Sequence, residues 1–241
     1  MIGTGHVFDI AEPVSFIIKH TWPEAVLVEL DENRFNALMN SNGKKATDPN
    51  DLSKDIPKIY RESARYQDKM SAENGVQTGS ELLAAINSGR LLGAEIICID
   101  RDAEQVMREL EEEMTFMEKR KYSISSFTDR LFGQKKVEST QNEFSANEEK
   151  YVENMRKRYP TLVRKLIDER NEFMADKIRT VLEKYNNVVV VVGDAHVEGL
   201  CKILEDHPIR KIRLIELMAK ERMDEIRSQI WNNKNSEGDS E

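Results

Sequence analysis

The apolar residues of this chain fall into two alternating patterns, short unbroken runs and longer segments with helical spacing. Unbroken runs occupy residues 25–28 and 188–192, and a third strand is expected over residues 95–99, which are apolar after Glu95. Short runs rich in β-branched residues are typical of strands that are buried on both faces of a parallel sheet. A segment with helical spacing follows each run. The pattern therefore predicts an α/β fold in which a central, mainly parallel sheet is flanked by helices.

A long helical insertion is predicted before the strand at Val188, over about residues 103–186. Its longest helix is expected over residues 161–185, where Arg170 and Asn171 interrupt the apolar stripe. A guanidinium on a core-facing stripe must be paired with an opposite charge. The candidate partners are acids that follow the predicted strands: Asp100, Asp102 and Glu29.

The C-terminal part of the chain is harder to assign. We expect a last strand within residues 209–217, a terminal helix over residues 218–231 and a disordered polar tail over residues 232–241. Residues 1–217 would then form a single domain, which is within the usual size range.

Composition narrows the class of protein. The chain has 241 residues and a formal net charge of −8, which argues against a general nucleic-acid binder. Its two cysteines are too few for a disulfide framework. No apolar stretch is long enough for a membrane span and no signal peptide is visible, so we expect a soluble, cytoplasmic protein. Long amphipathic helices are compatible with a homodimer.

Candidate chemistry gathers where the predicted strands end. Two G-x-x-H turns, residues 3–6 and 193–196, follow a very short first strand and the run at Val188. The carboxyl ends of parallel strands share one edge, so His6 and His196 are expected to meet Glu29 and the acids of residues 100–102. Imidazoles with a carboxylate can bind a divalent transition metal that activates water. Alternatively, a His–Glu pair activates water without metal, and an arginine stabilises an oxyanion.

Structural roles can also explain these residues. A single G-x-x-H turn is a weak signal that occurs in many turns. Glu29 and Asp31 are also in positions to cap the following helix, and Glu81 is favourable in the first turn of a helix without any function. Residues 100–102, Asp-Arg-Asp, are equally compatible with an ion-pair cluster that only fixes a loop, closed by Arg170.

Six segments, taken in order, resemble the TraB/PrgY/GumN family, which includes the Tiki proteins. They are GTGHV near the start, VELDENR ending at Arg34, GVQTGSELLAA around Glu81, IDRDAEQVMR ending at Arg108, ERNEFMADKI around Arg170 and VVVGDAHVEGL near the end. Together they extend over about residues 1–205. The resemblance implies an α/β core with a helical insertion, related to the erythromycin-esterase-like and ChaN-like folds.

The resemblance also implies functional residues. For Tiki-like members it implies metal-dependent peptidase activity, and for PrgY-like members it implies inhibition or turnover of a peptide pheromone. Carried over to this chain, the two histidine positions are His6 and His196, and the acid is Glu29 or Glu81. The basic groups are Arg101, Arg108 and Arg170. This chain departs from the expected Glu-Arg-Asp pattern, because the third position is Asn171. PrgY-like members carry C-terminal membrane spans, which the polar end of this chain does not support.

The leading hypothesis is a metal-dependent, peptidase-like hydrolase that acts on a peptide or small molecule. Manganese, cobalt or zinc would be bound by His6, His196 and Glu29, and catalysis would involve Glu29, Glu81, Arg101 and Arg170. The expected substrate contacts are Arg34, Asp100, Asp102, Arg108 and Asn171. One alternative is a non-catalytic protein that binds or sequesters a pheromone-like peptide. Another is a metal-independent, esterase-like hydrolase.

Overall fold

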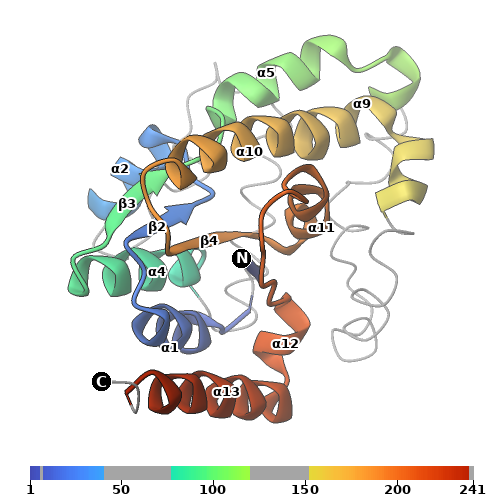
Figure 1. The fold of residues 1–241 in the computed structure, drawn as a ribbon. Helices are drawn as coiled ribbons and strands as arrows, with labels where there is room; N and C mark the ends of the chain where they lie inside the picture. The colour runs from blue at the N-terminus through green and yellow to red at the C-terminus, as the bar shows by residue number, and fades with distance from the viewer. Residues whose placement is uncertain (6–7, 41–76, 120–151, 239–241) are drawn as a thin grey trace.

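A four-stranded parallel sheet forms the centre of the protein (Figure 1). The computed structural model describes residues 1–5, 8–40, 77–119 and 152–238. In spatial order the strands are β1 (Ile2–Thr4), β4 (Val188–Gly193), β2 (Ala25–Val28) and β3 (Glu95–Cys98). The predicted α/β fold is therefore confirmed, and β2 has the residues that the apolar run predicts.

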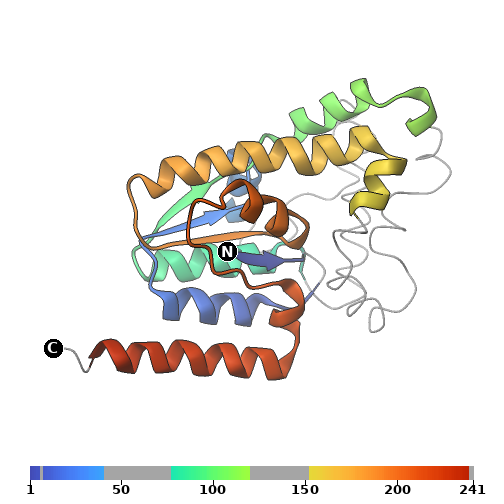
Figure 2. The same ribbon diagram turned by 45° about the vertical axis from the view of Figure 1, so that its right-hand side comes forward.

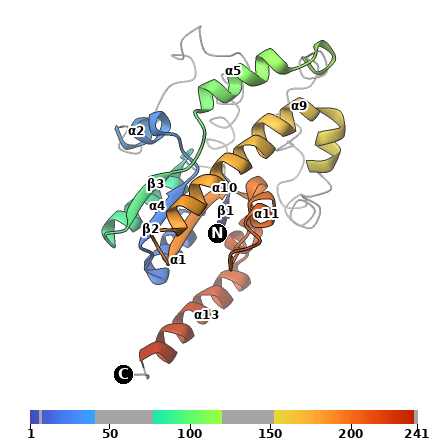
Figure 3. The same ribbon diagram turned by 45° about the horizontal axis from the view of Figure 1, so that its top comes forward.

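Each face of the sheet is covered by helices, as the unbroken apolar runs require. In β4, Val189 and Val191 pack in one core cluster with residues of α1 (Ala11–Thr21) and α4 (Ser80–Leu91). Val190 and Val192 pack in a second cluster, against α10 (Glu169–Leu182) and α11 (Asp194–Ile203). Figures 1 and 3 show α10 and α11 side by side on their face of the sheet.

The predicted insertion between β3 and β4 is mainly helical in the parts that the structure describes. It includes α5 (Ala103–Glu113), α9 (Pro160–Val163), a π-helical segment η1 (Arg164–Asp168) and α10. The helix predicted over residues 161–185 is therefore not a regular α-helix. A π-helical turn accommodates an extra residue, and such turns are frequent at functional sites. After β2, residues 29–31 lead into the helix α2 (Glu32–Asn40).

The predicted last strand within residues 209–217 is wrong. Only Ile212 makes a β-bridge, to Ile2, and the chain then enters the short helix α12 (Leu214–Met218). The reason is local: Glu216 accepts a hydrogen bond from the backbone N–H of Arg213 at 2.8 Å, which starts a helix instead of continuing the strand.

The last helix, α13 (Lys220–Gly238), is longer than predicted, so the expected tail is helical from residue 232 to residue 238. Figure 2 shows α13 as the outermost layer, beside α1. Met223 and Ile226 are buried against the α1 side of the core, and Arg227 bonds Glu12 of α1 at 2.8 Å. No helix within the described ranges has the length and apolar character needed to cross a membrane. The domain boundary at residue 217 and the homodimer stay predictions.

Candidate functional site

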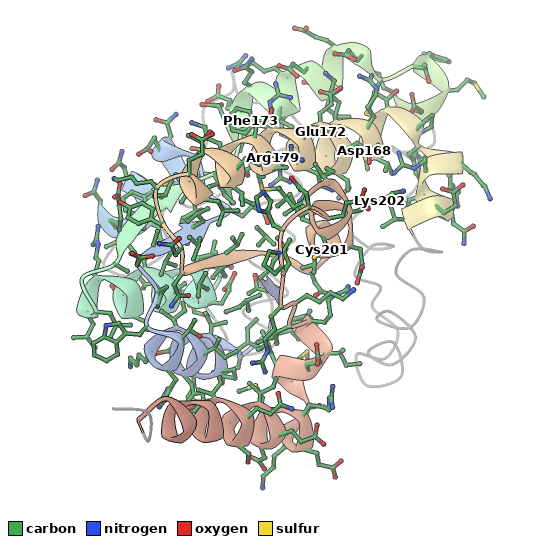
Figure 4. The ribbon with its side chains drawn as sticks, viewed as in Figure 1. Asp168, Glu172, Phe173, Arg179, Cys201 and Lys202 are labelled. Atoms are coloured by element: carbon green, nitrogen blue, oxygen red, sulfur yellow. The ribbon has the colours of Figure 1, made fainter. Side chains whose placement is uncertain are left out.

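A cluster of polar side chains lies at the carboxyl edge of the sheet, where α10 crosses it. Glu29 follows β2 directly, Asp100 follows β3, and His196 belongs to the first turn of α11, directly after β4. Arg170 and Asn171 reach the same place from α10. We call these five residues the carboxyl-edge cluster. Glu172 and Phe173, the next two residues of α10, are exposed on the outer side of the helix (Figure 4).

Arg170 joins two of the strand ends. Its Nε and Nη2 donate to Asp100 Oδ1 and Oδ2 at 2.9 and 2.7 Å, and Nη2 also bonds Glu29 Oε1. Nη1 donates to the backbone oxygen of Leu166 at 3.1 Å. Burial alone would lower the pKa of Arg170, but the neighbouring Glu29 and Asp100 carboxylates outweigh burial and raise it. The prediction that a buried Arg170 is paired with strand-end acids is confirmed.

His196 is held from both sides of its ring and is only 3% exposed. Its Nδ1 lies 2.7 Å from Asn171 Oδ1, and its Nε2 lies 3.4 Å from Glu29 Oε1. A Cβ on Gly199 would lie 2.2 Å from Asn171 Nδ2, so the amide reaches this position only because residue 199 is glycine. Glu29 is fixed in turn, since its Oε2 accepts from the Gly193 N–H at 2.5 Å.

This arrangement constrains the protons of His196. A carbonyl oxygen only accepts, so the nitrogen that faces Asn171 Oδ1 carries a proton. In a neutral ring, Nε2 is then an acceptor, and it faces the carboxylate oxygen of Glu29. Two acceptors at this separation attract one another only when a proton or a cation lies between them. The His196–Glu29 pair is therefore a place that favours a proton, a water molecule that donates, or a metal ion.

Arg34 marks the boundary between the carboxyl-edge cluster and solvent. Its Nη1 donates to Asp100 Oδ2 at 3.1 Å, and its Nη2 lies 3.4 Å from the backbone oxygen of Glu29. The Arg34 side chain is 29% exposed, whereas that of Asp100 is 1% exposed. Arg34 is therefore the solvent-accessible partner of this ion pair, and Asp100 is the buried one.

The predicted site acid Asp102 is a helix cap, as is Asp31, for which the sequence predicted a capping role. Asp31 accepts from the backbone N–H of Arg34 at 2.8 Å and from that of Ala103 at 3.2 Å. Asp102 accepts from the backbone N–H of Gln105 at 2.8 Å and from Asn33 Nδ2 at 3.1 Å. Asp31 thus caps α2 and also bonds the first residue of α5, and Asp102 caps α5 and also bonds a residue in the first turn of α2. These bonds hold the N-termini of the two helices together.

Arg101 and Arg108, two other predicted site residues, pair with acids of the helical insertion. The guanidinium of Arg101 donates to Glu109 at 2.8 Å and Glu169 at 3.3 Å, which directs it toward the helical insertion. Arg108 pairs with Glu104 on the exposed side of α5. Glu81 is fully buried in the first turn of α4, the helix on the opposite face of the sheet from α10. His6 lies outside the described residues.

The described residues bring together two of the predicted metal ligands, His196 and Glu29. Among the residues that the structure describes, no group of three His, Cys, Asp or Glu side chains is placed to hold a metal ion. His196 and Glu29 nevertheless fit two positions of such a site, because metal-binding histidines present one ring nitrogen and donate from the other to an oxygen. Asn171 Oδ1 is that oxygen here. The third ligand predicted from the sequence is His6.

Sequence reasoning missed the part that Gly199 plays. The signal was present, because an isolated glycine inside a helical pattern often has a packing reason. It also missed the backbone N–H of Gly193, which no side-chain pattern reveals. Both glycines lie in the segment that contains the second G-x-x-H turn.

Comparison with known proteins agrees with the resemblance found in the sequence. A model of the TraB/PrgY/gumN family matches residues 1–210. An uncharacterized protein of Methanocaldococcus jannaschii is 33% identical over 213 residues, which cover 85% of this chain and 53% of that protein. The chain therefore spans about half the length of this curated relative. Because the family model matches most of the sequence, the protein belongs to the TraB/PrgY/gumN family.

Proposed function

We propose that this protein is a hydrolase that cleaves an amide or ester bond in a peptide or small molecule, with His196 and Glu29 at its reaction centre. One observation supports this most. His196 Nε2 and Glu29 Oε1 lie 3.4 Å apart at the carboxyl edge of a parallel sheet, the place where open α/β sheets bind ligands. Such a pair can take a proton from water, as general-base hydrolysis requires.

The neighbours of His196 and Glu29 support this role because they fix both groups before any reaction. Asn171 holds the imidazole through Nδ1, which leaves Nε2 directed toward Glu29. Glu29 is held by Gly193 N–H and by Arg170. When Nε2 takes a proton, the ring becomes positive and the adjacent Glu29 carboxylate stabilises it. No side chain has to reorganise during this step, which is the property that makes electrostatic stabilisation effective.

The two arginines of this edge have different roles in the proposal. Arg170 and Arg34 together balance the charges of Glu29 and Asp100. Arg34 is the more exposed of the two arginines, so it is our candidate for contact with a substrate carbonyl or carboxylate. Arg170 is a positioning residue, because its donors are already bonded to Glu29, Asp100 and Leu166.

The metal-dependent form of the proposal uses the same residues. His196 and Glu29 would hold a divalent transition metal, together with His6 if the resemblance applies at that position. A metal held by these residues would supply the chemistry that makes a water molecule acidic near neutral pH. In the metal-free form, the His196–Glu29 pair takes the proton itself.

The test is hydrolysis of chromogenic esters and a fluorogenic peptide library by wild type, His196→Ala and Glu29→Gln. His207→Ala is the matched control, since His207 is partly exposed and lies near Asp206. Each protein is assayed after chelation and again after addition of manganese, cobalt or zinc. We expect both site variants to lose at least about 100-fold in kcat/KM, and the control to retain activity.

The outcomes separate the candidate functions. Activity that is lost on chelation and restored by one metal supports the metal-dependent form, and activity that survives chelation supports the metal-free form. If peptides bind tightly and stay uncleaved under every metal condition, the proposed function changes from a hydrolase to a protein that sequesters peptides. If wild type and both site variants hydrolyse the substrates equally well, the assignment of His196 and Glu29 to the reaction centre is refuted.

A further inference from the structure

A buried ion pair holds the helix that carries His196. Asp194 is the first residue of α11, and both its oxygens are bonded by Arg213: Nε to Oδ1 at 2.9 Å and Nη2 to Oδ2 at 2.8 Å. The backbone N–H of Leu214 adds a bond to Oδ1 at 2.9 Å. The side chains of Arg213 and Asp194 are only 12% and 4% exposed. Two parallel bonds of this kind fix direction as well as distance.

The same guanidinium reaches one turn further along α11. Arg213 Nη1 donates to Glu198 Oε1 at 2.8 Å, so one side chain spans Asp194 and Glu198. His196 lies between these two positions in the sequence. Arg213 therefore bonds the helix turn that presents the imidazole, from the side opposite to Asn171 and α10.

The first strand is shaped to accept this ion pair. A Cβ on Gly3 of β1 would lie 2.1 Å from Asp194 Oδ1, so only glycine leaves room for the carboxylate. The Gly3 N–H donates to the backbone oxygen of Ile212 at 2.8 Å, which places Arg213 beside β1. The start of the chain, the first turn of α11 and the segment around Arg213 therefore meet at one point.

The segment that contains Arg213 is also anchored at its far end. It continues through α12 into α13, which lies along α1 on the other side of the sheet (Figures 1 and 2). Arg227 of α13 bonds Glu12 and stacks over Phe16 of α1. Residues 211–238 thus form a strap from α11 to α1. The strap begins after residue 210, where the match to the family model ends.

We propose that Arg213 is a positioning residue for His196, and that the strap is part of the support of the reaction centre. The proposal rests on the proposed function for its effect on catalysis, but its structural core is separate. Without the guanidinium fork, Asp194 loses two side-chain bonds and Glu198 loses one, so the start of α11 and the imidazole that it carries are less firmly fixed. A small displacement of a reacting group is enough to lower a rate by about 100-fold.

The experiment compares wild type, Arg213→Met, Arg213→Lys and the neutralised pair Arg213→Met/Asp194→Asn. Lys211→Met is the matched control, because Lys211 lies in the same strap and bonds Glu198 at 2.7 Å. Proteins labelled with ¹⁵N-histidine report which ring nitrogen carries a proton and how uniform the ring environment is. The His196 signal is identified by its absence in His196→Gln. His20, whose Nδ1 bonds the Phe16 oxygen at 2.8 Å, is the internal reference.

We expect the His196 signals to move or broaden in Arg213→Met, Arg213→Lys and the neutralised pair, while His20 and the Lys211→Met spectrum stay unchanged. On a hydrolysed substrate, kcat should fall about 10- to 100-fold in the Arg213 variants with little change in KM. Arg213→Lys keeps the charge, so it tests the fork even if Arg213→Met does not fold. Unchanged His196 signals in folded Arg213→Lys and in the neutralised pair would overturn the proposal. Displaced His196 signals in a protein without hydrolytic activity would support positioning and reject only the proposed function.

Discussion

Arg170→Met is the most direct test of how the carboxyl-edge cluster is held together. Methionine has a similar length but no charge, so the substitution leaves Glu29 and Asp100 as buried carboxylates without their shared cation. Removing one partner of a buried ion pair costs about 3–5 kcal/mol, because the remaining charge is neither solvated nor compensated.

The structure places this variant at the lower end of that range. Asp100 keeps the ion pair with Arg34 at 3.1 Å and the Arg101 N–H at 2.8 Å. Glu29 keeps the N–H of Gly193 at 2.5 Å. We therefore expect a loss of about 3 kcal/mol in the free energy of unfolding. Arg170→Met/Asp100→Asn should lose less than the single variant, because one of the two carboxylates that Arg170 compensates is then neutral.

Urea unfolding followed by circular dichroism gives the free energy by linear extrapolation. Arg222→Met is the control, since Arg222 forms exposed ion pairs with Glu216 and Glu225 on α12 and α13. Its unfolding midpoint should stay close to that of wild type. If Arg170→Met loses no more stability than Arg222→Met, or if Asp100→Asn adds to the loss instead of reducing it, the account of a mutually compensated cluster is refuted.

Three further predictions concern other parts of the protein. Gly199→Ala should destabilise the protein by about 1–3 kcal/mol, because the new methyl group would collide with the Asn171 amide. Helix propensity alone predicts the opposite, a gain of about 1 kcal/mol. Urea unfolding gives the sign of the change in stability and so distinguishes the two. Burial alone would raise the pKa of Glu118, but hydrogen bonds from two threonines outweigh it and lower the pKa. Its stabilising effect is therefore present above the ordinary pKa and is lost in acid, so wild type should lose more stability than Glu118→Gln between about pH 5 and pH 3. Asp102→Ala should cost about 1 kcal/mol through loss of the α5 cap, and Asp102→Asn much less, as thermal unfolding can measure.

The sheet was predictable because a strand buried on both faces needs apolar side chains at every position, and few other local structures share that pattern. The run at residues 25–28 therefore coincides with β2. Residues 209–217 show that hydrophobic periodicity alone does not determine local structure. Ile212 and Leu214 are spaced as in a strand, yet a capping bond from Glu216 decides the local structure. Such a bond depends on backbone geometry that periodicity does not contain.

The pairing of Arg170 was predictable for a different reason. A guanidinium on a core-facing stripe must find a carboxylate, and the strand ends offered only a few. Which of these acids pair with Arg170 was not predictable. Asp31 follows the end of β2 by three residues and Asp102 follows the end of β3 by four, and both are caps where α2 and α5 begin beside one another. That contact is set by the packing of the insertion, which the sequence pattern leaves open.

The structure shows the surroundings of Asn171, which occupies the third position of the expected Glu-Arg-Asp pattern. The turn at residues 164–168 precedes Arg170 and Asn171, and the backbone oxygen of Leu166 within it accepts a bond from Arg170. Both side chains then reach the sheet edge from consecutive positions of α10. An aspartate in place of Asn171 would add a second negative charge beside His196, whereas the amide holds Nδ1 without charge. In this chain, the Glu29 carboxylate lies 3.4 Å from Nε2 of His196 and the amide of Asn171 adds no charge at Nδ1, so we expect the chemistry of His196 to depend on Glu29.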